Sequence, residues 1–112
     1  MNPNTFELLV NERFGQCWNI LIEKGEEYAT NDDQLHNFRE VAKLRHTTMS
    51  DACLGMGMKH IISVIDIVRA ISIGNALMTK AVIDKKIGDA INYLLLLEGC
   101  ITEEMKEKGF WK

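Results

Sequence analysis

The sequence predicts an all-α fold, a compact antiparallel bundle of four main helices in a single domain that spans residues 1–112. Apolar residues recur at spacings of three and four along most of the chain, which is the period of an amphipathic helix. The alternation of β-branched residues that is typical of strands is nearly absent, and the only proline is Pro3. Short polar breaks separate the periodic segments, and short connections favour helices that pack antiparallel to their neighbours.

The first two helices are predicted from an apolar stripe and a polar break. We expect the first helix over about residues 5–28, with Thr5 as its N-cap. Its apolar stripe repeats at three and four and comprises Phe6, Leu9, Val10, Phe14, Cys17, Ile20 and Leu21. The polar segment 29–33 interrupts this pattern, and Asp32 or Asp33 is expected to cap a second helix over about residues 33–45.

A third helix is predicted over about residues 51–73 by signals at both of its ends. Thr48 stands three residues before Asp51, which is a variant of the capping box, and Gly74 is suited to a left-handed stop. The apolar face of this helix is expected to comprise Leu54, Met58, Ile61, Ile65 and Val68.

The fourth helix is predicted over about residues 79–100. It is apolar almost all round from Ala90 to Leu97, so we expect it to be the most buried helix of the bundle. Residues 102–112 are expected to form a charged tail with a short helix at its start, ending in the aromatic pair Phe110 and Trp111.

Composition narrows the classes of function. The formal net charge of -3 and the lack of a basic patch argue against direct binding of nucleic acid. The chain has no apolar run near the roughly 20 residues that a membrane span requires, and its first residues lack the features of a signal peptide. The three cysteines are widely spaced and form no CxxC pattern, which argues against a disulfide framework or a zinc site. We therefore expect a cytoplasmic protein that does not contact a membrane.

Ionisable side chains fall on or beside the predicted apolar side of the first helix. At about 100° per residue from Cys17, Lys24 and Tyr28 lie within roughly 20° of the centre of the apolar stripe. Glu27 lies about 80° to one side, and Glu23 lies about 120° away. The helix end that carries these residues is therefore expected to face other helices in part.

Two further helices bring polar groups to an inward edge. On the third helix, Lys59 and Asp66 share one edge, and on the fourth helix Asp89 shares a face with Lys86 and Asn92. Taken one at a time, these residues are equally consistent with buried ion pairs, lysines that extend to the surface and a structural histidine at position 60. Taken together, carboxylates from three helices predict a site for a hard divalent cation such as Mg²⁺.

Four motifs support a family resemblance that covers about residues 18–101. They are Lys24-x-x-Glu27-Tyr28, Leu35-His36-Asn37-Phe38, Gly55-x-x-x-Lys59-His60-x-x-Ser63-x-x-Asp66 and Lys86-Ile87-Gly88-Asp89-x-x-Asn92-Tyr93. In this order and spacing they resemble small phage and prophage proteins that are associated with nucleotide modification. Those proteins are similar to the all-α nucleoside triphosphate pyrophosphohydrolases, the MazG-like superfamily.

The resemblance implies a Mg²⁺-dependent enzyme that hydrolyses a nucleoside triphosphate to a monophosphate and pyrophosphate. The metal ligands that it implies are Glu23, Glu27, Asp66 and Asp89. Lys86 occupies the position of the glutamate in the ExxD pair of the superfamily, and Asp66 is the residue that would replace that ligand.

The resemblance also implies roles beyond metal binding. Glu27, Asp89 and Lys59 are the implied catalytic residues, with Lys24 and Lys59 neutralising charge on phosphate oxygens. The remaining implied contacts to substrate come from Tyr28, Asn37, Phe38, His60, Lys86 and Asn92. Superfamily members commonly pair their bundles, so a homo-oligomer, either a dimer or a tetramer, is expected.

Two alternatives to an enzyme remain open from the sequence. The same bundle could bind and sequester a nucleotide or a nucleotide-like signal without turnover, which the lysine in the ExxD position favours. The chain could also be an interaction or inhibitor module, in which the inward charges form ion pairs and Phe110 and Trp111 anchor a protein partner.

Overall fold

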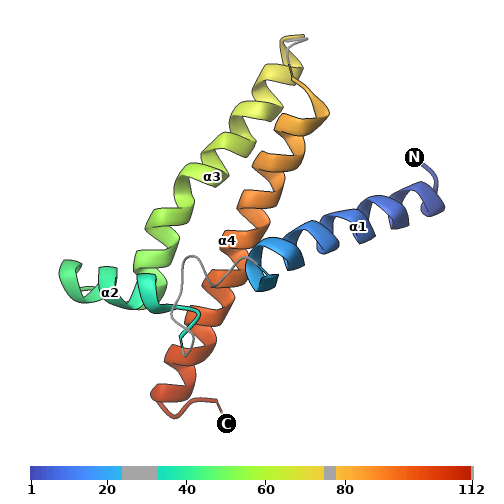
Figure 1. Cartoon of the computed structure of the whole chain (residues 1–112). Coiled ribbons are helices and arrows are strands. Elements are labelled where there is room, and N and C mark those ends of the chain that lie inside the picture. Colours follow the sequence, from blue (N-terminus) through green and yellow to red (C-terminus); the bar gives the residue numbers. More distant parts are fainter. Residues whose placement is uncertain (24–32, 75–77, 112) are drawn as a thin grey trace.

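The protein is all-helical in the computed structural model, which describes residues 1–23, 33–74 and 78–111. Its elements are α1 (Pro3–Trp18), the π-helix η1 (Asn19–Glu23), α2 (His36–Arg45), α3 (Met49–Ser72) and α4 (Lys80–Glu107). The long helices α3 and α4 form an antiparallel pair, α2 lies across the start of α3, and α1 projects from the middle of α4 (Figure 1). The predicted all-α fold with four helices packed against one another is confirmed.

The core lies where α2, α3 and α4 meet, and it is built largely from small side chains. Its buried residues are Phe38, Ala42, Met49, Ala52, Cys53 and Cys100. Gly57 extends this small-residue contact, since a Cβ atom at this position would lie only 2.8 Å from Cδ1 of Tyr93. Small residues on facing helices let the two backbones approach closely, so α3 and α4 pack tightly at this level.

Side-chain caps explain where the helices begin. Thr48 accepts a hydrogen bond from the backbone N–H of Asp51 at 3.1 Å, which confirms the predicted cap of α3. Thr79 caps α4 in the same way by accepting from the N–H of Val82 at 3.2 Å. Gly74 has a positive φ of 78°, as expected for the residue that stops α3.

Two predicted starts are wrong by a few residues, again because of caps. The first helix starts at Pro3 instead of Thr5, because Oδ1 of Asn2 accepts from the N–H of Thr5 at 2.8 Å and proline suits the first turn. The second helix starts at His36, because the carboxylate of Asp33 accepts from the N–H of Leu35 and so stabilises a turn that precedes the helix.

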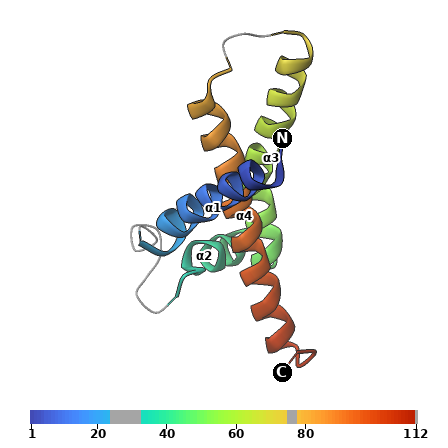
Figure 2. The same ribbon diagram turned by 90° about the vertical axis from the view of Figure 1, so that its right-hand side faces the viewer.

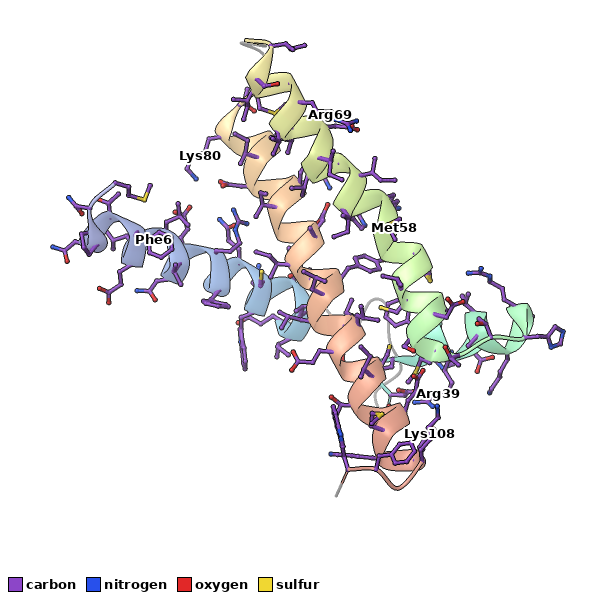
Figure 3. All side chains as sticks on the ribbon, turned by 180° about the vertical axis from the view of Figure 1, so that it is seen from behind. Phe6, Arg39, Met58, Arg69, Lys80 and Lys108 are labelled. Atoms are coloured by element: carbon purple, nitrogen blue, oxygen red, sulfur yellow. The ribbon has the colours of Figure 1, made fainter. Side chains whose placement is uncertain are left out.

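The fourth helix is longer and more exposed than predicted. It continues to Glu107, and its last turns are held by Arg39 of α2, whose Nη2 contacts Glu103 at 2.9 Å, and by the backbone N–H of Ser50, which donates to Glu104 (Figure 3). Leu94 and Leu95 are exposed, and α4 has four buried residues whereas the shorter α3 has five, so the expectation that α4 is the most buried helix is wrong. Among the described residues, α1, α2 and α3 cover only part of its circumference.

The apolar face predicted for the third helix is not its core face. Four of its five residues, Leu54, Met58, Ile65 and Val68, are exposed. The side that packs against the rest of the protein carries Met49, Cys53, Gly57 and Ile67 instead. The helix thus has apolar residues on two sides, and the side with smaller residues packs against α4 because it permits the closer approach.

The chain is more extended than the compact bundle that the sequence predicts. Its radius of gyration is 16.5 Å, whereas a compact chain of this length has about 13 Å. The predicted apolar stripe of α1 is buried at Cys17 and exposed at Phe6, Leu9 and Phe14 (Figure 3). Among the described residues, no helix combines the length and the apolar character needed to cross a membrane.

The contact between Gly57 and Tyr93 predicts a mutational effect. Replacement of Gly57 by Ala forces the Tyr93 ring away from α3, so the free energy of unfolding should fall by about 1–3 kcal/mol. The matched control is Gly15→Ala, where a Cβ meets nothing within 4 Å and the higher helix propensity should leave stability unchanged or raise it by up to about 1 kcal/mol. Urea denaturation of both variants measures the difference, and equal stability of the two would contradict this packing.

Candidate functional site

A cavity of about 300 Å³ lies between η1, α2 and the middle of α3 and α4. The end of α1 and the helix α2 lie on the same side of α4 (Figure 2). Residues of both η1 and α2 line the cavity. Its lining is mostly apolar, with Ile20 and Leu21 from η1, Phe38 from α2 and Leu96 from α4. A few polar groups, from Asn37, Asp89 and Asn92 among others, converge on it, which is the composition of a small-molecule site.

Three rings from three helices form one wall of this site. Tyr93 of α4 contacts Phe38 of α2 edge to face, with the ring centroids 6.1 Å apart. On its other side, Tyr93 packs on His60 of α3 with the ring centroids 4.7 Å apart. Because the Tyr93 ring is held between two partners, its position and that of the neighbouring α4 residues are well defined.

Asn92 is the buried polar residue at the centre of the site. Its side chain is only 5 % exposed, and its Oδ1 has no hydrogen-bond partner among the described residues. A buried amide oxygen without a partner costs about 1–3 kcal/mol, so such groups are rare unless a ligand or water completes them. Oδ1 itself has almost no accessible surface, so a ligand N–H would reach it only after the amide turns toward the cavity.

Asp89 lies one turn before Asn92, at the edge of the same cavity. Its Oδ2 contacts Nζ of the exposed Lys85 at 3.3 Å and lies 3.8 Å from Nδ1 of His60. Burial lowers the pKa of His60 below its usual value, with Lys59 and Lys85 adding to this effect and Asp89 opposing it. His60 is therefore neutral at pH 7, and within the described ranges Lys85 is the one cation in contact with the Asp89 carboxylate.

Arg13 of α1 is part of the site surroundings, although the sequence reasoning did not single it out. Its guanidinium donates to the backbone carbonyl and to Oδ1 of Asp84, both at 2.9 Å, and to Oε1 of Gln16 at 2.7 Å. Gly88 leaves room for this contact, because a Cβ there would lie 2.9 Å from Nη1 of Arg13. The sequence already indicated that Arg13 faces inward, because this residue lies about 40° from Cys17 on the apolar stripe of the first helix.

This ion pair positions one wall of the cavity. Arg13 is mostly buried and joins α1 to the first turns of α4, and Lys80 adds contacts from α4 to Glu12 and Asp84 (Figure 3). The contact fixes where α1 ends against α4, so η1 with Ile20 and Leu21 is placed beside Asp89 and Asn92.

The structure brings together some of the residues that the sequence singled out and separates others. Asn37, Phe38, Asp89 and Asn92 line the cavity, and His60 borders it through Tyr93 and Asp89. Lys59 and Asp66 are exposed on α3, Lys86 is partly buried, and Glu23 is exposed at the end of η1; none of these four lines the cavity. Lys24, Glu27 and Tyr28 lie outside the described residues, and the aromatic pair Phe110 and Trp111 is exposed beyond the end of α4.

The described residues supply part of a metal site at most. Over residues 1–23, 33–74 and 78–111, no three His, Cys, Asp or Glu side chains gather closely enough to hold a metal ion. Asp66 lies six residues beyond His60, about 9 Å farther along α3, so it does not meet Asp89. Asp89 is the carboxylate that lines the cavity, and the predicted ligand Glu27 is outside the described residues.

Comparisons with known proteins return no match, whether with protein families, curated proteins or solved structures. The resemblance to the MazG-like superfamily therefore stays a prediction from the four motifs.

The environment of His60 predicts how stability depends on pH. The pKa of His60 is lowered in the folded protein, so the unfolded chain binds a proton more readily than the folded one. The stabilisation from neutral His60 is complete above the unfolded pKa of about 6.5 and is lost as the pH falls below it. Urea denaturation between pH 7.5 and 5.5 should show a shallower loss of stability in His60→Gln than in the wild type.

The control for this effect is His46→Asn, at an exposed position with a positive φ of 54° that asparagine tolerates. This variant should keep the pH dependence of the wild type. A wild-type slope in His60→Gln would show that His60 is not the titrating group.

Proposed function

We propose that the protein binds a nucleotide in the cavity between η1, α2 and α4 and, with Mg²⁺, hydrolyses it to a nucleoside monophosphate and pyrophosphate. The observation that carries this proposal is the convergence of Asn37, Phe38, Asp89 and Asn92 on one cavity. These residues come from two separate motifs, and they combine an aromatic ring, two amides and a carboxylate. This set of groups suits a ligand that has a flat, hydrogen-bonding ring at one end and anionic groups at the other.

The base or sugar of the nucleotide fits the inner part of the cavity. The ring of Phe38 and the apolar side chains of η1 cover flat apolar surface, and Asn92 lines the same space. Its Oδ1 has almost no accessible surface, so it would accept a hydrogen bond from a ligand N–H or O–H once its amide turns toward the cavity. Asn37 is exposed at the rim and provides a second amide. A cavity of about 300 Å³ holds part of a nucleotide, so the phosphates extend toward its mouth.

The phosphates would lie near Asp89, where the chain provides a carboxylate and cations. Lys85 contacts Asp89 directly and Lys86 follows it in the same turn, so positive charge is available for phosphate oxygens. Asp89 is the residue that would hold Mg²⁺ here, together with Glu23 and Glu27 as the resemblance implies. When bound, Mg²⁺ would polarise the phosphate and lower the pKa of an attacking water.

Nucleotide binding without turnover is the second candidate function. It is favoured by one observation: within the described ranges, a single carboxylate lines the cavity, and Lys86 stands where the superfamily has a second one. Both functions use the same cavity and the same buried amide, and they differ in whether pyrophosphate is released.

Pyrophosphate release from a panel of nucleoside triphosphates with Mg²⁺ separates the two functions. The proposed enzyme should lose at least about 100-fold activity in Asp89→Asn, because a neutral amide does not replace a carboxylate ligand. Glu40→Gln is the control, since Glu40 is exposed on α2 and pairs with Lys43 at 3.2 Å. No release by the wild type above a protein-free blank would exclude the enzyme and leave nucleotide binding to be tested, whereas equal release by wild type and Asp89→Asn would show that Asp89 is not a catalytic residue.

Asn92→Leu tests the binding site itself through two opposite changes. Leucine removes the buried amide oxygen, so the free energy of unfolding without ligand should stay equal or rise by up to about 1 kcal/mol. Binding of the nucleotide, measured by calorimetry, should weaken about 10-fold or more, because the ligand donor is left unpaired. A loss of stability with unchanged binding would instead identify Asn92 as a structural residue.

A further inference from the structure

The helix α3 carries an exposed apolar stripe on the side opposite to its core face. Counting about 100° per residue, five exposed large apolar side chains lie within about 80° of the direction of Met58, and the partly buried Ile61 lies among them. The buried Met49 and Ile67 lie about 180° away. The five are between 43 and 63 % exposed: Leu54, Met58, Ile62, Ile65 and Val68. Met58 and Arg69 mark the side of α3 that is turned away from α4 (Figure 3).

This stripe is long and uninterrupted. Residues 54 to 68 span about 21 Å along the helix, with no charged residue of α3 near the centre line of the stripe between them. Arg45 of α2 lies beside Gly55, about 60° to one side, at the end of the stripe that carries Asp51. Lys59 and Asp66 lie about 80–100° to one side. Monomeric proteins rarely expose continuous apolar patches of more than a few hundred square ångströms, so the stripe has the character of an interaction surface.

Charges at the two ends of the stripe indicate what covers it. Asp51 and Arg69 are both exposed, and both lie within about 20° of the centre line, one at each end. A two-fold interface requires a surface that complements itself, with each end meeting the opposite end of the second copy. An antiparallel pair of α3 helices would place Asp51 beside Arg69 of the partner subunit twice, whereas a parallel pair would place like charges together.

The two patterns also agree in register. The midpoint of the charged pair falls at residue 60 and the midpoint of the apolar stripe at residue 61, so one two-fold axis serves both. A partner of unrelated sequence would need no such symmetry. Opposite charges with the same midpoint as the apolar side chains therefore favour a second copy of this chain.

We propose that two copies of the chain pair in solution through the outer faces of their α3 helices, antiparallel and with the two-fold axis near Ile62. The proposal is independent of the nucleotide site, because the cavity lies on the side of α3 that carries Met56 and faces α2 and α4. The pairing covers the stripe from Leu54 to Val68 and leaves α1, η1 and the mouth of the cavity accessible.

Disulfide cross-linking tests the geometry directly. The three native cysteines are buried, so an introduced surface cysteine is the only accessible thiol in the described part of the chain. Ile62→Cys places two thiols near the proposed axis, and mild oxidation should give a covalent dimer on a non-reducing gel. The control Leu44→Cys lies on an exposed position of α2 and should stay monomeric under the same conditions.

Sedimentation equilibrium tests the interface without a cross-link. The wild type should sediment as a dimer, and Ile65→Lys should be monomeric at the same concentration, because the two-fold axis places two lysines in an apolar contact. Ile71→Lys is the matched control: it is on the same helix and exposed but about 140° from the centre line, and it should remain dimeric. Circular dichroism confirms that each variant keeps its helix content.

A charge exchange tests the register. Asp51→Arg and Arg69→Asp should each raise the dimer dissociation constant by about 10-fold or more, and the double variant should return it to within a few-fold of the wild type. A monomeric wild type at about 100 μM would overturn the proposal. A dimer that survives Ile65→Lys, or a double variant no better than the single ones, would show that another surface or another register is used.

Discussion

The close contact of α3 with α4 is the constraint on which the rest of the molecule depends. Gly57 has no side chain, so the ring of Tyr93 lies directly against the backbone of α3. Cys53 and Cys100 continue this contact with small, fully buried side chains. Larger residues there would separate the helices, and both the core under α2 and the aromatic wall of the cavity would lose their partners.

The position of Tyr93 determines the chemistry beside it. Phe38 and His60 hold its ring on two sides, so the helical period turns the adjacent Asn92 toward η1 and buries its amide. An unpaired buried oxygen lowers the stability of a fold, and such groups are found mainly where a ligand or a water completes the hydrogen bond. The Arg13–Asp84 pair closes the other side of the site, because it fixes the end of α1 against α4. The α3–α4 contact therefore stabilises the fold, and this stabilisation offsets the free-energy cost of the polar groups that line the cavity.

The α3 helix shows how one element can serve a core and a second surface. Both of its apolar sides have the helical period, so hydrophobicity alone does not distinguish them. The side with Cys53 and Gly57 is used inside the protomer because it allows close packing. The larger residues on the other side, Leu54, Met58 and Ile65, remain exposed in the protomer, together with Phe6 and Phe14 on α1.

The sequence by itself determined the helices and some of their ends, because period and capping are local properties. Thr48 caps α3 and Gly74 stops it as predicted. The misplaced starts at Pro3 and His36 involve caps only a few residues away, and α4 continues past its predicted end. It also singled out Asp89 and Asn92, since polar groups at the inward edge of a helix are visible as exceptions to the period, whereas Asn37 and Phe38 were implied only by the family resemblance.

Tertiary structure alone decided which apolar side of α3 is buried, which part of the α1 stripe is covered and which polar residues meet. Asp66 and Asp89 have the same character in sequence, yet only Asp89 reaches the cavity, because the antiparallel pairing places it beside His60. Arg13 gains its role only when Gly88 of a distant helix leaves space for it. The physical reason is the same in each case: a helical period specifies a direction around one axis, whereas contact depends on how closely a second axis can approach.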